Sequence, residues 1–445
     1  MKNSKYKIIL LITFFFCAFN VTAQRNVNWV HGLDGNASSW EHYNQIFDAE
    51  RTEFTNASSL RATYPTDNGI DSSANSVINS MNTYYGTTGA DQAHNSRNLG
   101  IGHSMGGLMI RDVDRLNGSG NKNFGGYITV TSPNYGAPIS NSIIDGSVES
   151  AAENACNKLA DGPLAQLFSL PWGIVSNLAT NVLCDKFIDN DLIQNLQGTP
   201  VTNADLRVGS PTINAINNYT DNTNSNIPRI SIWAEENSPV HWRMFSSAVS
   251  NNDMTLVNTV NSARGVYNGF HIYNTSLGIA SVVGGFWNPL LWGSSGLYFY
   301  RASQWRKGRN WIDDSENIWS SLIKTTRRET QTYWTYQYIP CIYQKFNNVG
   351  SFGRAPDYGP VDPNCDEWRW VQRTRYISVN YPSDGLLPQY TQELQGILPG
   401  NRYKVEGANH IEVRNMTTDG NVVDETYEEF IKIFNRIPGD FFRTN

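Results

Sequence analysis

The chain has 445 residues, a formal net charge of −6 at pH 7 and a 12% share of aromatic residues. This length fits one large domain with insertions, or two domains. An acidic chain lacks the basic surface that nucleic-acid binding requires, so we expect no nucleic-acid partner.

The N-terminal residues 1–23 have the three parts of a secretory signal peptide. Lysines come first, an apolar run follows at 8–19, and small residues precede a predicted cleavage site after Ala23. The apolar run is too short to anchor the chain across a bilayer. We therefore expect a secreted or periplasmic protein.

Strands and helices alternate along the first part of the chain and return near its end. The predicted strands cover 26–30, 98–102, 127–131, 227–234, 375–380 and 402–405. The predicted helices cover 71–84 and 106–116, with another beginning at Ser38, where Glu41 completes a capping box, and a last one beginning at Asp424. This alternation predicts an α/β fold with a mostly parallel central sheet flanked by helices.

The segment Gly102-His103-Ser104-Met105-Gly106 contains the pattern G-x-S-x-G between a predicted strand and a predicted helix. In this setting the serine sits on a sharp turn that lifts its hydroxyl above the sheet, and the glycines allow strand and helix to approach. The pattern alone also occurs in ordinary glycine-rich turns. With strand and helix in place, it predicts Ser104 as a nucleophile, and His103 as a structural residue whose side chain points away from it.

This motif, together with His31-Gly32-Leu33 after the first strand, resembles secreted lipases and esterases of the α/β-hydrolase superfamily. It is also similar to the GPI inositol-deacylase-like branch of that superfamily. The resemblance covers about 26–138 and returns at about 375–435. It implies an α/β-hydrolase fold, two backbone donors for an oxyanion at Met105 and Leu33, with Asp34 as a neighbouring choice, and no cofactor or metal.

A base and an acid should follow the nucleophile in the chain, each in a loop after a strand. His410 follows a late strand and is the predicted base, and Asp384 in an Asp-Gly loop is the predicted acid. Rival acids are Glu235 and Glu236, at the end of the strand 227–234, and Asp366. The alternatives remain open because Asp-Gly is also a common turn dipeptide.

Two segments interrupt the alternation. We expect 24–239 and 373–445 to form one catalytic domain, with a helical lid at 140–205 and an inserted cap at 240–372. The apolar stretch 277–300 inside the cap is read either as its core or as a surface that contacts lipid.

Four cysteines follow the predicted cleavage site, and in an exported chain they predict disulfides. We favour the pairs Cys156–Cys184 and Cys341–Cys365, which are local in the sequence, among three pairings. No CxxC, HExxH or clustered histidine pattern is present, so we expect no metal site.

Taken together, the sequence predicts a secreted serine hydrolase that cleaves carboxylic esters through an acyl-Ser104 intermediate. Its substrate would be a small-molecule or lipid ester, and no obligate protein partner is implied. An acyltransferase or an amidase could use the same side chains. A protein that keeps the fold and only binds a ligand is the alternative from another class.

Overall fold

The protein is described here from a computed structural model. The residues that it describes are 27–33, 35–40, 60–85, 98–117, 124–148, 150–151, 199–223, 227–236, 316–340, 343–346, 357–360 and 367–414, with a few isolated positions besides. The chain divides into two compact units. The larger contains the central sheet, and the smaller is Thr326–Tyr381.

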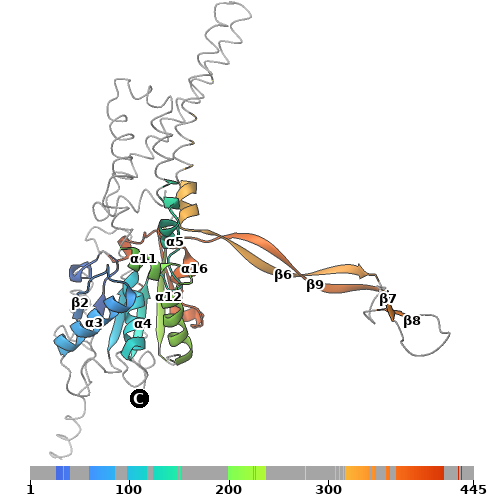
Figure 1. Ribbon diagram of the computed structural model, residues 1–445. Coiled ribbons are helices and arrows are strands. Elements are labelled where there is room, and N and C mark those ends of the chain that lie inside the picture. The colour runs from blue at the N-terminus through green and yellow to red at the C-terminus, as the bar shows by residue number, and fades with distance from the viewer. Residues whose placement is uncertain are drawn as a thin grey trace, which may run out of the picture. The chain divides into compact units, whose positions relative to one another are not determined.

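The central sheet has six strands, all parallel, in the spatial order β10-β5-β4-β3-β1-β2 (Figure 1). Their bounds are β1 Val27–Val30, β2 Leu60–Ala62, β3 Leu99–His103, β4 Gly126–Val130, β5 Arg229–Glu235 and β10 Arg402–Glu406. Helices connect and cover these strands. This arrangement confirms the predicted parallel sheet flanked by helices and is that of an α/β-hydrolase fold.

The helices in the described part of the larger unit are mostly short, apart from the two longest, α3 and α4. Their bounds are η1 Ala37–Trp40, α3 Ile70–Tyr85, α4 Met105–Asn117, α5 Pro138–Ile144, α11 Pro200–Leu206, α12 Pro211–Asn218, η4 Tyr219–Thr223, α16 Gln389–Gln392, η5 Pro399–Asn401 and η6 Glu412–Arg414. A helical stretch at 316–322 precedes the smaller unit.

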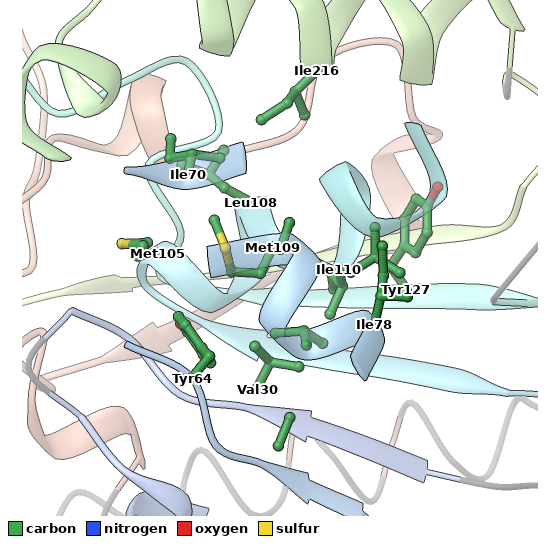
Figure 2. Close-up of a cluster of buried hydrophobic side chains, with 14 of the residues drawn as sticks. Val30, Tyr64, Ile70, Ile78, Met105, Leu108, Met109, Ile110, Tyr127 and Ile216 are labelled. Atoms are coloured by element: carbon green, nitrogen blue, oxygen red, sulfur yellow. The ribbon is translucent and has the colours of Figure 1, made fainter. Parts of the chain in front are cut away.

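Apolar side chains fill both faces of the sheet, because neighbouring residues of a strand point to opposite sides. On one face, Val30 and Tyr127 meet the buried sides of α3 and α4, with Met109 and Ile216 in the same cluster (Figure 2). The other face carries a second cluster that includes Trp29, Ile101, Ile128 and Ile232. All described residues of β1, β3 and β4 are buried, as expected of a parallel sheet covered on both sides.

Two helix details differ from the sequence-based expectation. The first helix is capped by Asn36 and not by Ser38: its Oδ1 accepts from Ser38 N at 2.9 Å, and Ser39 Oγ accepts from Asn36 N at 3.2 Å. The capping pair therefore lies two residues earlier than predicted. In α3, Tyr84 has the helical spacing of the buried Val77 and Met81 but is 44% exposed, because it lies near the end of the helix.

The smaller unit is a long antiparallel ribbon, drawn in orange in Figure 1. It is formed by β6 Thr326–Ile339 and β9 Glu367–Asn380, paired along their whole length. Two short strands, β7 Tyr343–Phe346 and β8 Asp357–Pro360, form a second antiparallel pair. The strand predicted at 375–380 exists but is the last part of β9, so it belongs to this ribbon and not to the central sheet.

Several expectations fall on residues outside the described ones. These are the signal peptide at 1–23, the four cysteines, the apolar stretch 277–300 and the C-terminal helix beginning at Asp424. Most of the predicted lid and cap lies there too, so the predicted domain division stays a prediction, with its boundary at 372 falling inside β9. None of the described helices is long and apolar enough to span a membrane.

Candidate active site

Ser104 lies on the turn between β3 and α4, and its backbone is in the left-handed region with φ +53°. Few non-glycine residues adopt this conformation, and they concentrate at functional sites. A Cβ at Gly102 would overlap the backbone of Gly106, and a Cβ at Gly106 would overlap the carbonyl oxygen of Val30. The two glycines therefore let β1, β3 and α4 meet closely enough to form this turn.

Three predicted site residues come together at this edge of the sheet. His410 Nε2 lies 2.9 Å from Ser104 Oγ, and His410 Nδ1 lies 2.7 Å from Asp384 Oδ2. Asp384 is fully buried and His410 is nearly so. When the Nδ1–H of His410 donates to Asp384 Oδ2, Nε2 is left with a lone pair that can accept the serine proton.

The loop around Asp384 holds its carboxylate in one orientation. Oδ1 accepts from Leu386 N at 3.0 Å and from Leu387 N at 2.7 Å, which leaves Oδ2 for His410. Trp319 Nε1 donates to Gly385 O at 2.6 Å from the helical stretch 316–322. Because one carboxylate oxygen is fixed by backbone donors, the other has a defined direction toward the imidazole.

The residue that follows β5, Glu236, is hydrogen-bonded to Ser383, which is 147 residues later in the chain. Glu236 N donates to Ser383 O at 2.9 Å, so the Asp384 loop directly adjoins the end of β5. Gln392 fastens it further, since its Oε1 accepts from Ala234 N at 3.0 Å and its Nε2 donates to Leu387 O at 2.7 Å. The acid loop is thus joined to β5 by hydrogen bonds as well as by the chain.

The rival acids occupy other places. Glu235 forms an ion pair with Lys404 of β10 at 2.5 Å, and Glu236 is buried beside the Asp384 loop. The carboxylate hydrogen-bonded to the His410 ring is that of Asp384. Asp366 lies outside the described residues. The geometry therefore favours Asp384 among the rivals that the structure describes.

A capping box positions His410. Asn409 Oδ1 accepts from Glu412 N at 3.0 Å, while Glu412 Oε2 accepts from Asn409 N at 3.1 Å. His410 N also donates to Asp384 O at 2.8 Å. Both the ring and the backbone of His410 are therefore joined to Asp384.

His103 is hydrogen-bonded to the loop that carries His410. Its Nε2 donates to His410 O at 2.8 Å, and its ring centroid lies 5.0 Å from that of His410. Burial lowers the pKa of His103 well below its ordinary value, with nearby His410 and Arg414 adding to the effect. His103 is thus a neutral hydrogen-bond donor. The sequence predicted a structural role for it but not its hydrogen bond to His410 O.

The predicted oxyanion donors lie beside Ser104. Met105 is the first residue of α4, so its N–H has no acceptor within the helix. A Cβ at Gly32 would lie 2.7 Å from Ser104 Cβ, which puts the end of β1 against the nucleophile and Leu33 directly after it. Asp34, the alternative to Leu33, lies outside the described residues.

A buried arginine links the nucleophile helix to the acid loop. Arg111 of α4 is fully buried, and its Nη1 donates to Asn134 Oδ1 at 3.1 Å. Asn134 Nδ2 in turn donates to Gln392 O at 2.5 Å. No sequence signal identified this network, because its hydrogen-bonded partners are up to 258 residues apart in the chain.

In the part of the chain that the structure describes, no cluster of three or more His, Cys, Asp or Glu side chains could hold a metal ion. The three hydrogen-bonded side chains thus lie together within the unit that contains the parallel sheet.

No family model matches the sequence, and no curated protein matches it. Among solved structures, the chain is similar to the lipase BlEst2 of Bacillus licheniformis in its mature form, with 13% identity and a TM-score of 0.30. That match covers 52% of this chain and 74% of the lipase. Phospholipase PlaB of Legionella pneumophila matches with 14% identity and a TM-score of 0.32, over 52% of this chain and 42% of PlaB. The complex of PlaB with thio-NAD gives 15% identity, a TM-score of 0.30, and 52% and 40% coverage.

Proposed function

We propose that this chain is a serine hydrolase that cleaves carboxylic ester bonds, with Ser104 as nucleophile, His410 as base and Asp384 as acid. The observation that carries the proposal is the continuous line of hydrogen bonds from Ser104 Oγ through the imidazole to the buried carboxylate. A ligand-binding protein would need neither the strained serine nor the aligned imidazole.

The geometry supports a two-step reaction. His410 Nε2 takes the proton of Ser104 Oγ as the oxygen attacks the ester carbonyl carbon, and then gives that proton to the leaving alcohol. The acyl group remains on Ser104 until His410 deprotonates a water that attacks it, which releases the acid and restores the serine. Asp384 stabilises the imidazolium that forms in both steps.

The negative oxygen of each tetrahedral intermediate needs preorganised donors. In the proposal these are the backbone N–H groups of Met105 and Leu33, and the N-terminus of α4 adds the favourable end of the helix dipole. Loss of one such donor typically lowers the rate about 100- to 1000-fold. The assignment depends on the place of Ser104 directly before Met105 and against Gly32 at the end of β1.

Export and the class of ester complete the proposal. The three-part N-terminus supports export to the periplasm or the medium, and the high aromatic content suits an apolar ester. The resemblance to secreted lipases and esterases also supports an ester hydrolase. The more specific proposal is a member of the GPI inositol-deacylase-like branch.

The deciding experiment is covalent labelling with a fluorophosphonate, which reacts with an activated serine. The wild type should be labelled and should hydrolyse chromogenic short-chain esters, whereas Ser104→Ala should do neither. Ser72→Ala, at an exposed serine of α3, is the matched control and should behave as the wild type.

Each other result has a defined meaning. Absence of labelling in the folded wild type would contradict the proposal and favour a ligand-binding protein. Labelling at Ser104 without ester turnover would instead point to acyl transfer or amide cleavage.

A further inference from the structure

The ribbon formed by β6 and β9 has two chemically different faces. Directly paired residues of an antiparallel ribbon point to the same side. The pairs Tyr336–Trp370 and Tyr338–Trp368, with Trp334 next to them, therefore share one face. We call these five residues the aromatic face. The aliphatic residues of the two strands all lie on the opposite face, at Ile339, Val371, Ile377 and Val379.

The rings of the aromatic face touch one another and still remain open to solvent. The centroid of Tyr336 lies 5.7 Å from that of Trp368 and 5.5 Å from that of Trp370. Trp334, Trp368 and Trp370 are 62%, 60% and 64% exposed. A continuous exposed apolar surface of this kind usually marks a binding site.

The charge of the ribbon is opposite to that of the chain. The two strands carry five arginines and two glutamates, a net charge of +3, whereas the whole chain carries −6. Arg373 and Arg375 are exposed and lie on the face opposite the aromatic one. Arg328 stands over the ring of Tyr376 at 4.1 Å. The ribbon is thus a cationic and aromatic element of an acidic protein.

We propose that the ribbon binds the surface of anionic membranes, with the aromatic face in the headgroup region and the net positive charge of the two strands attracted to the anionic surface. Trp and Tyr are the residues that prefer the boundary between hydrocarbon and water, because each has an apolar ring and a polar N–H or O–H. Basic residues near an anionic surface add attraction, which salt weakens.

The charge of the ribbon argues for an anionic lipid surface over the other occupants of an aromatic surface. A symmetric dimer through this face would bring together two strand pairs that each carry a net charge of +3, and like charges oppose such a contact. A neutral glycan could stack on the rings but would gain nothing from the positive charge.

The experiment measures binding of the full chain to sedimented vesicles, with no reference to hydrolysis. Vesicles of phosphatidylcholine are compared with vesicles that also contain phosphatidylglycerol, at low and high salt. The wild type should bind the anionic vesicles more strongly, and salt should weaken this binding. The double variant Trp368→Ser/Trp370→Ser should lower the partition coefficient about tenfold or more.

A second pair of variants leaves the stacked rings intact. Arg373→Gln/Arg375→Gln lowers the net charge of the two strands from +3 to +1, so it should weaken binding to anionic vesicles severalfold and leave the weak binding to phosphatidylcholine unchanged. Thr332→Ser lies on the same side of the ribbon as the aromatic face and serves as the control that should bind as the wild type. Near-ultraviolet circular dichroism checks that the rings remain packed.

Several outcomes would overturn the proposal. The first is that the wild type binds neither kind of vesicle. The second is that both double variants bind vesicles as strongly as the wild type. The third is that the protein binds a soluble oligosaccharide through the aromatic face and binds no vesicles. A concentration-dependent dimer that the Trp368→Ser/Trp370→Ser variant dissociates, again without vesicle binding, would assign the surface to a second copy. Fluorophosphonate labelling of the same samples reports separately on the proposed hydrolase.

Discussion

At the scale of single residues, Asp384 makes the largest difference to the proposed chemistry. It is fully buried, and it holds the His410 ring through its carboxylate and the His410 backbone through its carbonyl. Asp384→Ala should lower kcat about 10⁴-fold, because the imidazole loses its tautomer and its orientation. Steady-state hydrolysis of a chromogenic ester measures the effect, and Asp384→Asn, which retains most of the side chain's volume, checks that the loss is not due to misfolding.

Glu235→Ala is the matched control for this prediction. Glu235 ends β5 close to the same loop but forms its ion pair with Lys404 on the surface. Its loss should leave kcat close to that of the wild type, because a surface ion pair contributes little to stability. If Glu235→Ala were inactive and Asp384→Ala active, the acid would have to be assigned to the end of β5.

His103 links the folded site to pH. Its pKa lies well below 6.5 in the folded protein, because burial disfavours the charged ring, and returns to about 6.5 on unfolding. Below pH 6.5 the unfolded chain therefore binds more protons at this residue, and stability falls as the pH falls. Above pH 6.5 the contribution is constant.

The difference in unfolding free energy between pH 7.5 and pH 5 should therefore be smaller in His103→Gln than in the wild type. Between pH 7.5 and pH 5, the wild type should lose about 2 kcal/mol more of its unfolding free energy than the variant. Denaturant unfolding at several pH values measures it. Parallel curves down to pH 5 would show that His103 is protonated in the folded protein as readily as in the unfolded one.

Residue identities at the site were predictable where a local pattern carries them. Ser104 stands in G-x-S-x-G, and His410 follows a late strand. Asp384 was one choice among several, because an Asp-Gly turn is common and the decisive contact spans 26 residues. The bond from His103 to His410 O, across 307 residues, leaves no trace in a local pattern and was not predicted.

At the scale of elements, the turn at Ser104 depends on the approach of β1 to α4. Gly106→Ala should lower the free energy of unfolding by about 3 kcal/mol, because the new methyl group would overlap the carbonyl oxygens of Val30 and His31. Denaturant unfolding measures this change, together with ester hydrolysis.

Gly146→Ala is the comparison. Unlike Gly106, Gly146 has a positive φ, at +74°, and no atom lies within 4 Å of its added Cβ. Only the backbone penalty of about 1 kcal/mol applies there. Equal effects of the two substitutions would mean that close packing at Gly106 is not what limits this turn.

The strands β1, β3, β4 and β5 were predictable because their residues are buried on both faces and form short apolar runs. The ribbon was not, apart from the end of β9. Its two strands are exposed, so they need no alternation of apolar and polar residues, and that alternation is the main sequence signal for a half-buried strand. The three-residue β2 is too short to give any signal.

At the scale of the whole molecule, the two units carry separate proposed functions. All the hydrogen bonds described for Ser104, Asp384 and His410 lie within the larger unit. The first and last residues of the ribbon, Thr326 and Asn380, are directly paired, so their Cα atoms are roughly 5 Å apart and a short linker can replace everything between them.

Replacing 326–381 by a short Gly-Ser linker should leave fluorophosphonate labelling and the hydrolysis of soluble esters unchanged. The same variant should lose its binding to anionic vesicles. Both measurements on one sample test the separation. A folded variant that no longer reacts with the probe would show that the ribbon contributes to the proposed site.

The hydrogen bond from Glu236 to Ser383 bears on the integrity of the polypeptide itself. β10 pairs with β5, and the Asp384 loop is hydrogen-bonded to the end of β5. These contacts can hold the reactive groups in place even if the chain is cut between 237 and 382. Two fragments severed in that interval, one bearing the serine and the other the carboxylate and the imidazole, would have the contacts needed to reassemble by complementation.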